Sequence, residues 1–372
     1  MSTILSLAPY KFLPPANGGN WAIFLADKIL AVHNDIHAVG LPDNKYDSYP
    51  IYRPYPVLDT GKHRYLPYSQ YKKVLAVAQA VAPDYIFCHH HYMFPMVRKV
   101  AKKLGVPAYI RSQNIEAERF RSIGRWWWPL MRAFEKWCYR NADAVFFITE
   151  NDREAAIQHY GLREEQAVVM PFAIEIPAKP TMPAGTRAKV ALDLNLNPDI
   201  PWLFFMGQLD YYPNTEAVEL IIKEILPLLR KDNKPFQILI CGRNLPEALQ
   251  TAIQQEADAV IKYLGFVPDI NEMIEACDVL LNPVLAGGGI KTKVVESLAW
   301  NKMVVSTMTG AEGIEPAVCN NKLRLVQDND WQAFTAAVWK AVEERNLYQI
   351  EAPFFDFYYV DHIAGRMQAY FK

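Results

Sequence analysis

One pattern constrains the chain most: short apolar runs alternate with longer segments whose apolar residues recur at helical spacing, and the pattern occurs twice. The short runs have the composition of buried strands, and the longer segments have that of helices packed on one face. Strands and helices that alternate in this way form parallel sheets covered by helices on both faces. The strands are expected at residues 3–9, 35–41, 83–90, 106–112, 143–149 and 166–171, and then at 202–207, 235–242, 260–265, 278–283, 303–308 and 323–327. The helices are expected at residues 18–34, 71–82, 95–105, 115–141 and 151–161, and then at 213–232, 245–255, 270–277, 291–300 and 330–345.

The alternation pauses over residues 175–200, which are rich in Pro, Gly and Ala and show no period. Such a stretch is typical of a domain connection. We therefore expect an N-terminal Rossmann-like domain at 1–178, a C-terminal one at 179–350, and a helix at 351–372 that packs across the junction. A ligand crevice is expected at the carboxyl ends of the strands in each domain. Residues 42–68, rich in Tyr and Pro, are expected to form a long structured loop.

The composition excludes several classes of protein. The chain has 372 residues with 39 Lys and Arg against 40 Asp and Glu, and this formal charge of -1 argues against a dedicated nucleic-acid binder. Its five cysteines are scattered without a CxxC pair, so we expect buried thiols and neither a disulfide framework nor a metal site. No signal peptide and no membrane-spanning run is evident. We expect a cytoplasmic protein, either free or peripheral at the inner face of the membrane.

A glycine-rich turn near the end of the second half is the first candidate site. In "NPVLAGGGIKTKVVESLAW" (residues 282–300), three glycines follow a strand and lead into a helix. A helix start has unpaired N–H groups and partial positive charge, and glycines let an anion approach them closely. Lys291 and Lys293 add charge there, and Glu296 lies about a turn and a half further along, where it could accept sugar hydroxyls. The alternative is a tight turn followed by two solvated lysines.

A second glycine pair follows the first strand of the other domain. Gly18 and Gly19 precede an expected helix, with Asn20 as its expected cap. Two glycine-opened helices at matching crevices favour a phosphate-bearing ligand bound between the domains. Neither stretch has the G-x-G-x-x-G pattern of the dinucleotide fold.

The second half resembles the nucleotide-sugar-binding domain of the GT-B glycosyltransferases, most closely family 4 (group 1 glycosyl transferases) in its PN-containing variant. The motifs that carry the resemblance are "FFMGQLDYYPNTEAVELIIKEILPLL", "ICGRNLPEAL" and "YLGFVPDINEMIEACDVLLNPVLAGGGIKTKVVESLAWNKMVVSTMTGAEGI". They cover about residues 203–315. The first half is similar more loosely, through the glycine pair, "PDYIFCHHH" and "VPAYIRSQNIEAERF". The implied fold is α/β, GT-B, with two Rossmann-like βαβ domains facing across a cleft.

The resemblance implies roles at matching positions. Glu296 matches the second glutamate of the family's E-x7-E element, which binds the ribose of the nucleotide. The backbone of residues 265–267, ending at Val267, would read the base. The remaining donor-binding candidates lie in the two glycine loops and beside them: Gly18, Gly19, Arg243, Gly287, Gly288, Gly289, Ile290 and Lys291.

Three positions depart from the family pattern. Gly288 stands where the first glutamate of E-x7-E is expected, and Gln208 stands where many members have a phosphate-binding arginine. Gln113 replaces a histidine often found beside the reaction centre. The missing phosphate-binding cation is expected to be replaced by one of three others, with Lys291 favoured: Arg243, Lys291 or Lys293.

Three residues of the first half are catalytic candidates. His90 belongs to a run of three histidines at the end of an expected strand, and we expect it to contact acceptor or donor sugar, the alternative being a packed strand-end histidine. Asn114 and Glu116 follow the next strand. Glu116 could orient the acceptor hydroxyl or act as a base; alternatively it only stabilises a helix N-terminus. No metal is expected at the histidines.

The segment "RFRSIGRWWWPLMRAFEKW" places arginines around Trp126, Trp127 and Trp128. Indoles beside cations suit a membrane interface, and such a patch would be useful to an enzyme with a lipid-linked acceptor. The alternative is an aromatic cluster packed on the core. The acidic residues 328–331 are expected only to cap the last large helix.

These observations favour a glycosyltransferase that moves a sugar from a nucleotide-sugar donor, UDP- or GDP-linked, to a hydroxyl of a glycan or lipid-linked glycan in cell-envelope polysaccharide synthesis. The resemblance implies a reaction that needs no metal or other cofactor and that retains the anomeric configuration. Because of Gln113, Gln208 and Gly288, a non-catalytic relative that binds nucleotide or sugar and acts through partners is the alternative. A nucleotide-sugar epimerase of the same architecture is a third interpretation.

Overall fold

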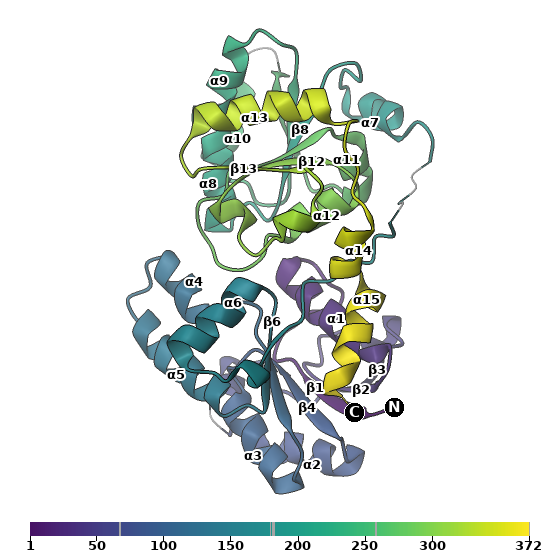
Figure 1. Ribbon diagram of the computed structural model, residues 1–372, viewed down its shortest axis with the longest axis vertical. Helices are drawn as coiled ribbons and strands as arrows, with labels where there is room; N and C mark the ends of the chain where they lie inside the picture. Colours follow the sequence, from purple (N-terminus) through teal and green to yellow (C-terminus); the bar gives the residue numbers. More distant parts are fainter. Residues whose placement is uncertain (67, 179, 181–182, 257–258, 372) are drawn as a thin grey trace. The chain divides into compact units, whose positions relative to one another are not determined.

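The computed structural model describes residues 1–66, 68–178, 180, 183–256 and 259–371. It divides into two compact units, each an α/β structure (Figure 1). Unit 1 comprises Met1–Glu175, Gly288–Ile290 and Asp356–Lys372, and unit 2 comprises Ile176–Gly287 and Lys291–Phe355.

Within its described residues, unit 1 contains a seven-stranded sheet in the order β3-β2-β1-β4-β5-β6-β7, with all neighbouring strands parallel. Its strands are β1 (Thr3–Leu7), β2 (Asp35–Val39), β3 (Tyr52–Tyr55), β4 (Tyr85–His89), β5 (Ala108–Arg111), β6 (Ala144–Phe147) and β7 (Ala167–Val169). The chain adds strands on one side of β1 and then on the other, so the order reverses between β1 and β4. Ligands bind at such switch points, beyond the carboxyl ends of the strands.

Helices connect these strands (Figure 1). The α-helices of unit 1 are α1 (Gly18–Ala31), α2 (Tyr71–Val81), α3 (Phe94–Leu104), α4 (Glu116–Ser122), α5 (Trp128–Arg140) and α6 (Glu150–Ala155). A π-helical turn, η3 (Ala156–Tyr160), continues α6, and short 3-10 turns lie at η1 (Tyr46–Ser48), η2 (Lys62–Tyr65) and η4 (Glu164–Gln166).

The described residues of unit 2 form a six-stranded parallel sheet in the order β10-β9-β8-β11-β12-β13, with its switch point between β8 and β11. Its strands are β8 (Trp202–Met206), β9 (Gln237–Cys241), β10 (Ile261–Gly265), β11 (Val279–Asn282), β12 (Met303–Thr307) and β13 (Leu323–Val326). Its helices are α7 (Thr186–Leu194), α8 (Tyr212–Leu220), α9 (Leu226–Lys231), α10 (Glu247–Gln255), α11 (Ile270–Ala276), α12 (Thr292–Ala299) and α13 (Trp331–Glu344). A π-helical turn, η5 (Ile221–Ile225), joins α8 to α9, and 3-10 turns lie at η7 (Thr309–Ala311) and η8 (Pro316–Val318).

The central strands are mostly apolar because helices cover both faces of each sheet. Every residue of β6, β8 and β12 is buried. Each unit therefore has its own hydrophobic core between sheet and helices. The two sheets confirm the parallel α/β class that the alternating pattern predicts.

The prediction of a single helix over residues 115–141 is wrong. The structure has two helices, α4 and α5, separated by a turn in which Gly124 adopts φ +71°. The apolar period continues across the turn, so it gave no sign of the break. The glycine was the signal, because a left-handed residue ends a helix.

Two elements were missed. Residues 52–55 form β3 at the sheet edge, where Pro54 is tolerated, so the expected loop over 42–68 contains a strand. Helix α7 lies in the stretch expected to be irregular, and Leu192 on it is 83% exposed. Arg187 anchors α7 by hydrogen bonds to the Ala276 carbonyl (2.7 Å) and to Asp278 (3.0 Å), so tertiary contacts stabilise a helix that its own sequence marks weakly.

The end of the chain belongs to unit 1 from Asp356 onward. It follows α14 (Ala352–Tyr358) and contains α15 (Val360–Met367) and η9 (Gln368–Tyr370), with α15 beside α1 (Figure 1). Backbone hydrogen bonds link Ile174 with this segment, and Phe371 packs on aromatic rings of β4 and β5.

Candidate functional site

The glycine loop connects β11 to α12, as the sequence predicts. Gly287 and Gly289 adopt φ +87° and +76°, a conformation that favours glycine. A Cβ on Gly287 would also lie 3.1 Å from the Pro213 ring. Lys291 precedes α12 and donates a hydrogen bond from Nζ to the Gly287 carbonyl (2.8 Å). The loop is thus a compact turn with a cation folded over it.

Lys293 was weighed as one of three substitute cations, and the structure gives it the more enclosed position. Its Nζ donates to Oδ1 of Asn214 (2.9 Å) and lies 3.8 Å from the centre of the Phe205 ring. Burial, followed by repulsion from Lys291, holds the pKa of Lys293 well below its ordinary value. Asn214 is the asparagine of the "PN" in the family variant. The sequence did not reveal that its side chain accepts a hydrogen bond from Lys293.

Glu296 lies one turn further along α12 and is partly buried. Burial raises the pKa of its carboxyl to about 7, against the attraction of Lys293, which lowers it. Among the residues that the structure describes, none is recorded as a hydrogen-bond donor to this carboxylate. A half-buried carboxylate without such donors, on the helix that follows the glycine loop, can accept hydrogen bonds from the hydroxyl groups of a ligand.

Beside the loop, the turns after β9 and β10 form a second part of the unit 2 site. Gly242 adopts φ +146°, and a Cβ there would meet the Gly207 carbonyl, so only glycine fits. The guanidinium of Arg243 lies 3.9 Å from the centre of the Phe266 ring, which is 58% exposed. Val267 follows directly. The structure therefore places Arg243 beside the segment expected to read the base, and it adds Phe266 as an exposed aromatic surface.

In unit 1, the first glycine pair starts α1, as the sequence predicts. The expected cap is wrong by one turn: Asn17 is the N-cap, and its side chain accepts a hydrogen bond from the Asn20 amide (3.0 Å). Gln113 donates to the Gly19 carbonyl (3.4 Å). The residue that replaces the family's histidine therefore lies at the glycine loop.

The three histidines have different environments. His89 is fully buried, and its Nε2 lies 2.9 Å from Asp27. His91 is buried against Met131, and burial lowers its pKa to about 3. His90 has φ +64° and lies between the rings of Tyr10 and Tyr92, and burial lowers its pKa to about 4. Only His90 is partly accessible, and it is neutral at pH 7.

Glu116 is the first residue of α4 and is held on two sides. Its carboxylate accepts a hydrogen bond from Tyr92 (2.7 Å) and two from Arg119 (3.1 and 2.6 Å). Burial acts to raise its pKa, but the Arg119 and Tyr92 bonds outweigh it and hold the pKa below its ordinary value. An ionised, paired carboxylate is a weak proton acceptor. Asn114 lies just before, with its side-chain oxygen buried and no recorded partner among the described residues.

Glu135 on α5 was missed by the sequence reasoning. It is fully buried and accepts hydrogen bonds from the backbone amides of Glu116 (2.9 Å) and Ala117 (3.3 Å) and from the hydroxyls of Tyr139 (2.9 Å) and Tyr160 (2.7 Å). Burial raises its pKa to about 7. It caps the start of α4 and so fixes the position of Glu116. The sign of it in the sequence was a single acidic residue among the apolar positions of an expected helix.

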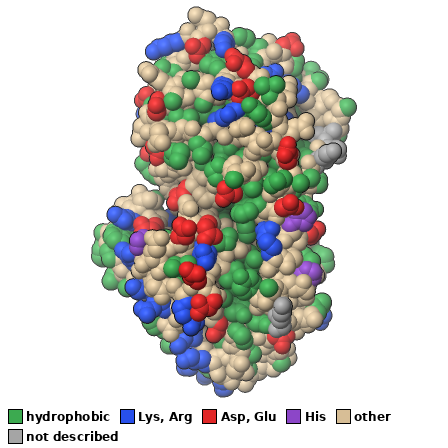
Figure 2. All heavy atoms as spheres, in the orientation of Figure 1, with side chains coloured by type: hydrophobic (Ala, Val, Ile, Leu, Met, Phe, Trp, Pro, Cys, Tyr) green, Lys and Arg blue, Asp and Glu red, His purple; other side chains and the backbone are tan. Residues whose placement is uncertain are grey.

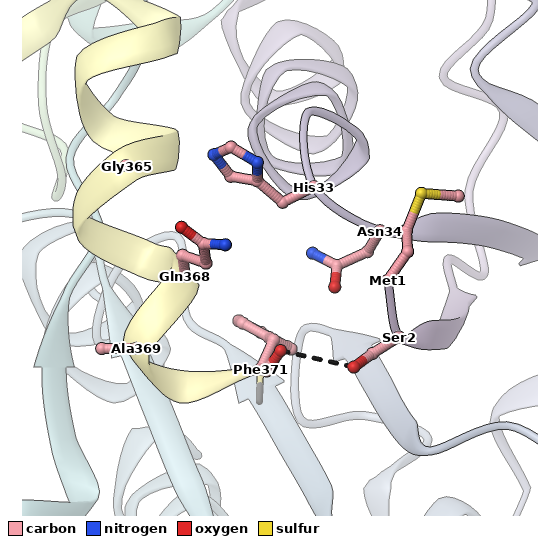
Figure 3. Close-up of a pocket in the computed structure, with 8 residues that line it drawn as sticks. All are labelled: Met1, Ser2, His33, Asn34, Gly365, Gln368, Ala369 and Phe371. Carbon is pink, nitrogen blue, oxygen red and sulfur yellow. Dashed lines mark hydrogen bonds between the residues drawn. The ribbon is translucent and has the colours of Figure 1, made fainter.

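The candidate residues thus form one group in each unit. Unit 1 brings together His90, Tyr92, Glu116 and Arg119, and unit 2 brings together Gly287, Lys291, Lys293 and Glu296. A surface depression in unit 1 lies elsewhere, between the start of β1 and the end of the chain, where Ser2 bonds to the Phe371 carbonyl (Figure 3). It is remote from the carboxyl ends of the strands.

Within the described ranges, no His, Cys, Asp or Glu side chains gather in threes that could hold a metal ion. None of the described helices is long and apolar enough to cross a membrane. All five cysteines are buried free thiols, as expected. Asp330 caps α13 by accepting from the Ala333 amide (2.9 Å), which confirms the predicted cap.

Comparison with known proteins defines the class. Residues 200–344 match the family described as "Glycosyl transferases group 1", and residues 23–176 match the one described as "Glycosyltransferase Family 4". Together these matches span most of the chain, which belongs to the group 1, family 4-like glycosyltransferases and is a glycosyltransferase enzyme. A comparison with curated proteins finds no significant sequence match.

Solved structures of known proteins share the fold. HepE from Anabaena, in complex with UDP and glucose, is 16% identical with a TM-score of 0.76, covering 100% of this chain and 99% of its own. Sucrose-phosphate synthase from Thermosynechococcus elongatus is 16% identical with a TM-score of 0.74, covering 100% and 98%. WaaG, a glycosyltransferase involved in lipopolysaccharide biosynthesis, is 13% identical with a TM-score of 0.67, covering 99% and 94%. At these identities the likeness establishes the fold, which is the GT-B fold.

Proposed function

We propose that this enzyme transfers a sugar from a nucleotide-sugar donor to a hydroxyl group of a glycan or lipid-linked glycan. The observation that carries the proposal is the carboxylate of Glu296. It is half-buried in the middle of α12, it is attracted by Lys293, and no described residue donates a hydrogen bond to it. Ribose hydroxyls are the donors that such a carboxylate requires. UDP and glucose are bound by the similar protein HepE, which supports a UDP-sugar as the donor, with a GDP-sugar as the alternative.

The donor-side chemistry follows from the charges of unit 2. The amides of the loop at Gly287, Gly288, Gly289 and Ile290, with the positive end of α12 behind them, would hold the diphosphate. Lys291 adds a full charge at the same place. As the bond between sugar and diphosphate breaks, negative charge grows on the leaving oxygen, and fixed donors stabilise it. A site with these charges supplies what a divalent cation supplies elsewhere, so we propose a metal-independent reaction that needs no cofactor.

The acceptor-side chemistry is assigned to unit 1. Gly18 and Gly19 would contact the diphosphate at the start of α1. Glu116, ionised and paired with Arg119, is suited to orient an acceptor hydroxyl rather than to take its proton. His90, which is neutral, and Asn114 can accept or donate hydrogen bonds to a sugar. Retention of the anomeric configuration is proposed on the family resemblance alone.

The cellular setting is part of the proposal. A lipid-linked acceptor would place the enzyme on the cytoplasmic face of a membrane, in cell-envelope polysaccharide synthesis. The likeness to WaaG, which takes part in lipopolysaccharide biosynthesis, supports this setting. The indoles of Trp126, Trp127 and Trp128 were expected to make the contact, and they are unequal: Trp126 is exposed, whereas Trp127 and Trp128 are partly buried.

A screen of the purified protein against UDP-, GDP-, dTDP- and ADP-sugars, read by mass spectrometry without added metal, tests the proposal. We expect release of one nucleotide by the wild type and its loss in Glu296→Ala. A matched control is Glu224→Ala, which removes an exposed carboxylate elsewhere in unit 2. Nucleotide binding without turnover, even with glycan acceptors, would favour the non-catalytic alternative. Absence of nucleotide binding would contradict the proposal.

A further inference from the structure

Four partly exposed aromatic side chains gather in unit 1, beyond the carboxyl ends of β1 and β4. Tyr10 follows β1, Tyr65 ends η2, and His90 and Tyr92 follow β4. Neighbouring ring centroids lie 5.3 Å (Tyr10 and His90), 5.8 Å (His90 and Tyr92), 6.1 Å (Tyr92 and Tyr65) and 6.4 Å (Tyr65 and Tyr10) apart. Each ring therefore contacts two others, and we call these four residues the tyrosine cluster. It lies at the switch point of the sheet, where folds of this kind bind ligands.

Hydrogen bonds hold the cluster in place. The guanidinium of Arg64 donates to the Pro9 carbonyl (2.9 Å) and to the hydroxyl of Tyr65 (3.0 Å), and it lies 4.5 Å from the centre of the Tyr65 ring. The hydroxyl of Tyr65 also donates to the Pro9 carbonyl (3.2 Å). These bonds tie η2 to the chain that follows β1. Because the surface is fixed before a ligand arrives, little entropy is lost when the ligand binds.

Polar groups stand at the edge of these rings. The hydroxyl of Tyr92 donates to Glu116 (2.7 Å), the residue proposed to orient the acceptor hydroxyl. The hydroxyl of Tyr10 has no recorded hydrogen-bond partner within the described part of the chain. Burial raises the pKa of Tyr10 well above its ordinary value, so this hydroxyl stays protonated and can donate. The tyrosine cluster thus joins apolar ring surfaces to a few hydrogen-bonding groups.

A pyranose ring has the matching chemistry. Its C–H groups form apolar faces that pack on aromatic rings, and its hydroxyls point outward, where they need hydrogen-bond partners. Aromatic side chains with a few placed polar groups are the usual lining of a site for such a ligand. An aliphatic lipid chain fits less well, because it would leave the hydroxyl of Tyr10 without a partner.

A phosphate group fits less well too. It would lie close to Glu116, whose carboxylate is ionised. Arg64, whose guanidinium lies on the Tyr65 ring, already donates to a backbone carbonyl and to a hydroxyl. Figure 2 shows Lys and Arg side chains of unit 1 gathered on the side where Figure 1 places α3 and α5. The charges at the cluster therefore favour a neutral sugar over an anionic ligand.

We propose that the tyrosine cluster binds a pyranose ring of the acceptor, with an apolar face of the sugar on the aromatic rings and one hydroxyl directed to Glu116. This inference rests on the proposed function and adds Tyr10, Tyr65 and Tyr92 as residues that determine acceptor specificity. It also gives the enzyme a place in a reaction sequence. An acceptor that already contains a sugar must be supplied by an earlier glycosyl transfer, so this enzyme extends a glycan and does not start one on a bare lipid.

Saturation-transfer difference NMR on the full chain tests the binding. The probes are the methyl glycosides of glucose, galactose, mannose, rhamnose and N-acetylglucosamine. Sorbitol is the control ligand, because it has similar hydroxyl groups and no ring. The nucleoside diphosphate that the donor screen identifies is present throughout. We expect saturation of the ring C–H protons of at least one glycoside and none of sorbitol. Saturation of sorbitol to the same extent, or of no glycoside, would overturn the proposal.

Two variants locate the binding. Tyr65→Leu removes a ring but keeps apolar bulk, and Tyr10→Phe keeps the ring but removes its hydroxyl. Each is expected to weaken glycoside binding about 2- to 10-fold. The matched control Tyr348→Leu removes a partly exposed ring of unit 2 and is expected to leave binding unchanged. Circular dichroism checks folding, and Tyr10→Phe, which preserves the packing, decides if Tyr65→Leu is unstable. Equal binding by the wild type and Tyr10→Phe, together with equal binding by a folded Tyr65→Leu, would overturn the proposal.

Transfer kinetics with the glycoside that binds separate this inference from the proposed function. Both variants are expected to raise the KM for the acceptor by the same factor as the loss of binding, with kcat nearly unchanged. Their affinity for the nucleoside diphosphate, measured by calorimetry, should equal that of the wild type, because other residues are proposed to bind it. Absence of nucleotide binding by the wild type would contradict the proposed function. Normal nucleotide binding with an unchanged acceptor KM in both variants would contradict the tyrosine cluster alone.

Discussion

Two carboxyl groups, the buried Glu135 in unit 1 and the half-buried Glu296 in unit 2, have the same raised pKa of about 7 and opposite surroundings. Glu135 in unit 1 is enclosed by four hydrogen-bond donors: two backbone amides and two tyrosine hydroxyls. Glu296 in unit 2 has Lys293 nearby and no recorded donor within the described part of the chain. A shifted pKa alone therefore does not identify a binding residue. The donor set does: Glu135 is satisfied by the protein, and Glu296 is left for a ligand.

The largest effect is expected at Glu135. Replacing it by alanine leaves the buried Tyr160 hydroxyl and the first amides of α4 without an acceptor, whereas the Tyr139 hydroxyl keeps Ser112 (2.7 Å), and each group left unpaired costs about 1–3 kcal/mol. We expect Glu135→Ala to lower the free energy of unfolding by about 3–5 kcal/mol, measured by urea denaturation. A loss under 1 kcal/mol would mean that the four bonds do not stabilise the fold.

Glu296→Ala is expected to have the opposite effects, a small change in stability and a large loss of nucleotide affinity. It removes a partly desolvated carboxylate with no recorded donor, so the unfolding free energy should change by under about 1 kcal/mol. Nucleotide affinity should fall by about 2–3 kcal/mol, because hydrogen bonds to a charged group are lost. Calorimetric titration with the nucleoside diphosphate of the donor that the screen identifies measures this. A large loss of stability with unchanged affinity would make Glu296 a second structural acid and remove the contrast with Glu135.

The pH dependence of nucleotide binding should follow the ionisation of the Glu296 carboxyl group. Hydroxyl groups donate to the ionised carboxylate, so nucleotide binding favours the form present above the pKa of about 7. Affinity should be constant well above pH 7 and weaken as the pH falls through the pKa, by up to about 1.4 kcal/mol per pH unit. Titrations at several pH values with the wild type and Glu296→Gln separate this from protonation of the phosphates. A pH profile shared by both proteins would contradict the assignment.

The smallest effect is expected at Gly287. Alanine there must adopt φ +87°, which costs about 1 kcal/mol of stability. Gly105→Ala is the matched control, since Gly105 also has a positive φ but lies in open space at the end of α3. Both variants should lose stability, Gly287→Ala somewhat more because its Cβ lies 3.1 Å from the Pro213 ring, and only Gly287→Ala should bind nucleotide several-fold more weakly. Equal affinities would mean that the glycine loop is only a turn.

The sequence predicted what depends on local pattern. Strands buried on both faces were assigned correctly, as were most helices with a clear apolar period and the start of α12 after the glycines; the exception is residues 115–141, which form α4 and α5. The sequence did not reveal α7, because its stability comes from the bonds of Arg187 to residues about ninety positions away. Glu135 was missed for the same reason: its four donors come from α4, α5 and η3, which only the fold brings together. Lys293 was weighed among the substitute cations, but its contact with Asn214 needed the structure.

The central claim is that Glu296 binds the ribose of the donor nucleotide. The most direct test compares the nucleoside diphosphate with its 2′,3′-dideoxy analogue, on the wild type and on Glu296→Gln, by calorimetry. We predict that losing the hydroxyls weakens wild-type binding by about 2–3 kcal/mol and weakens the variant far less. Equal losses in the two proteins, agreeing within about 0.5 kcal/mol, would show that Glu296 does not bind the ribose and would contradict the account.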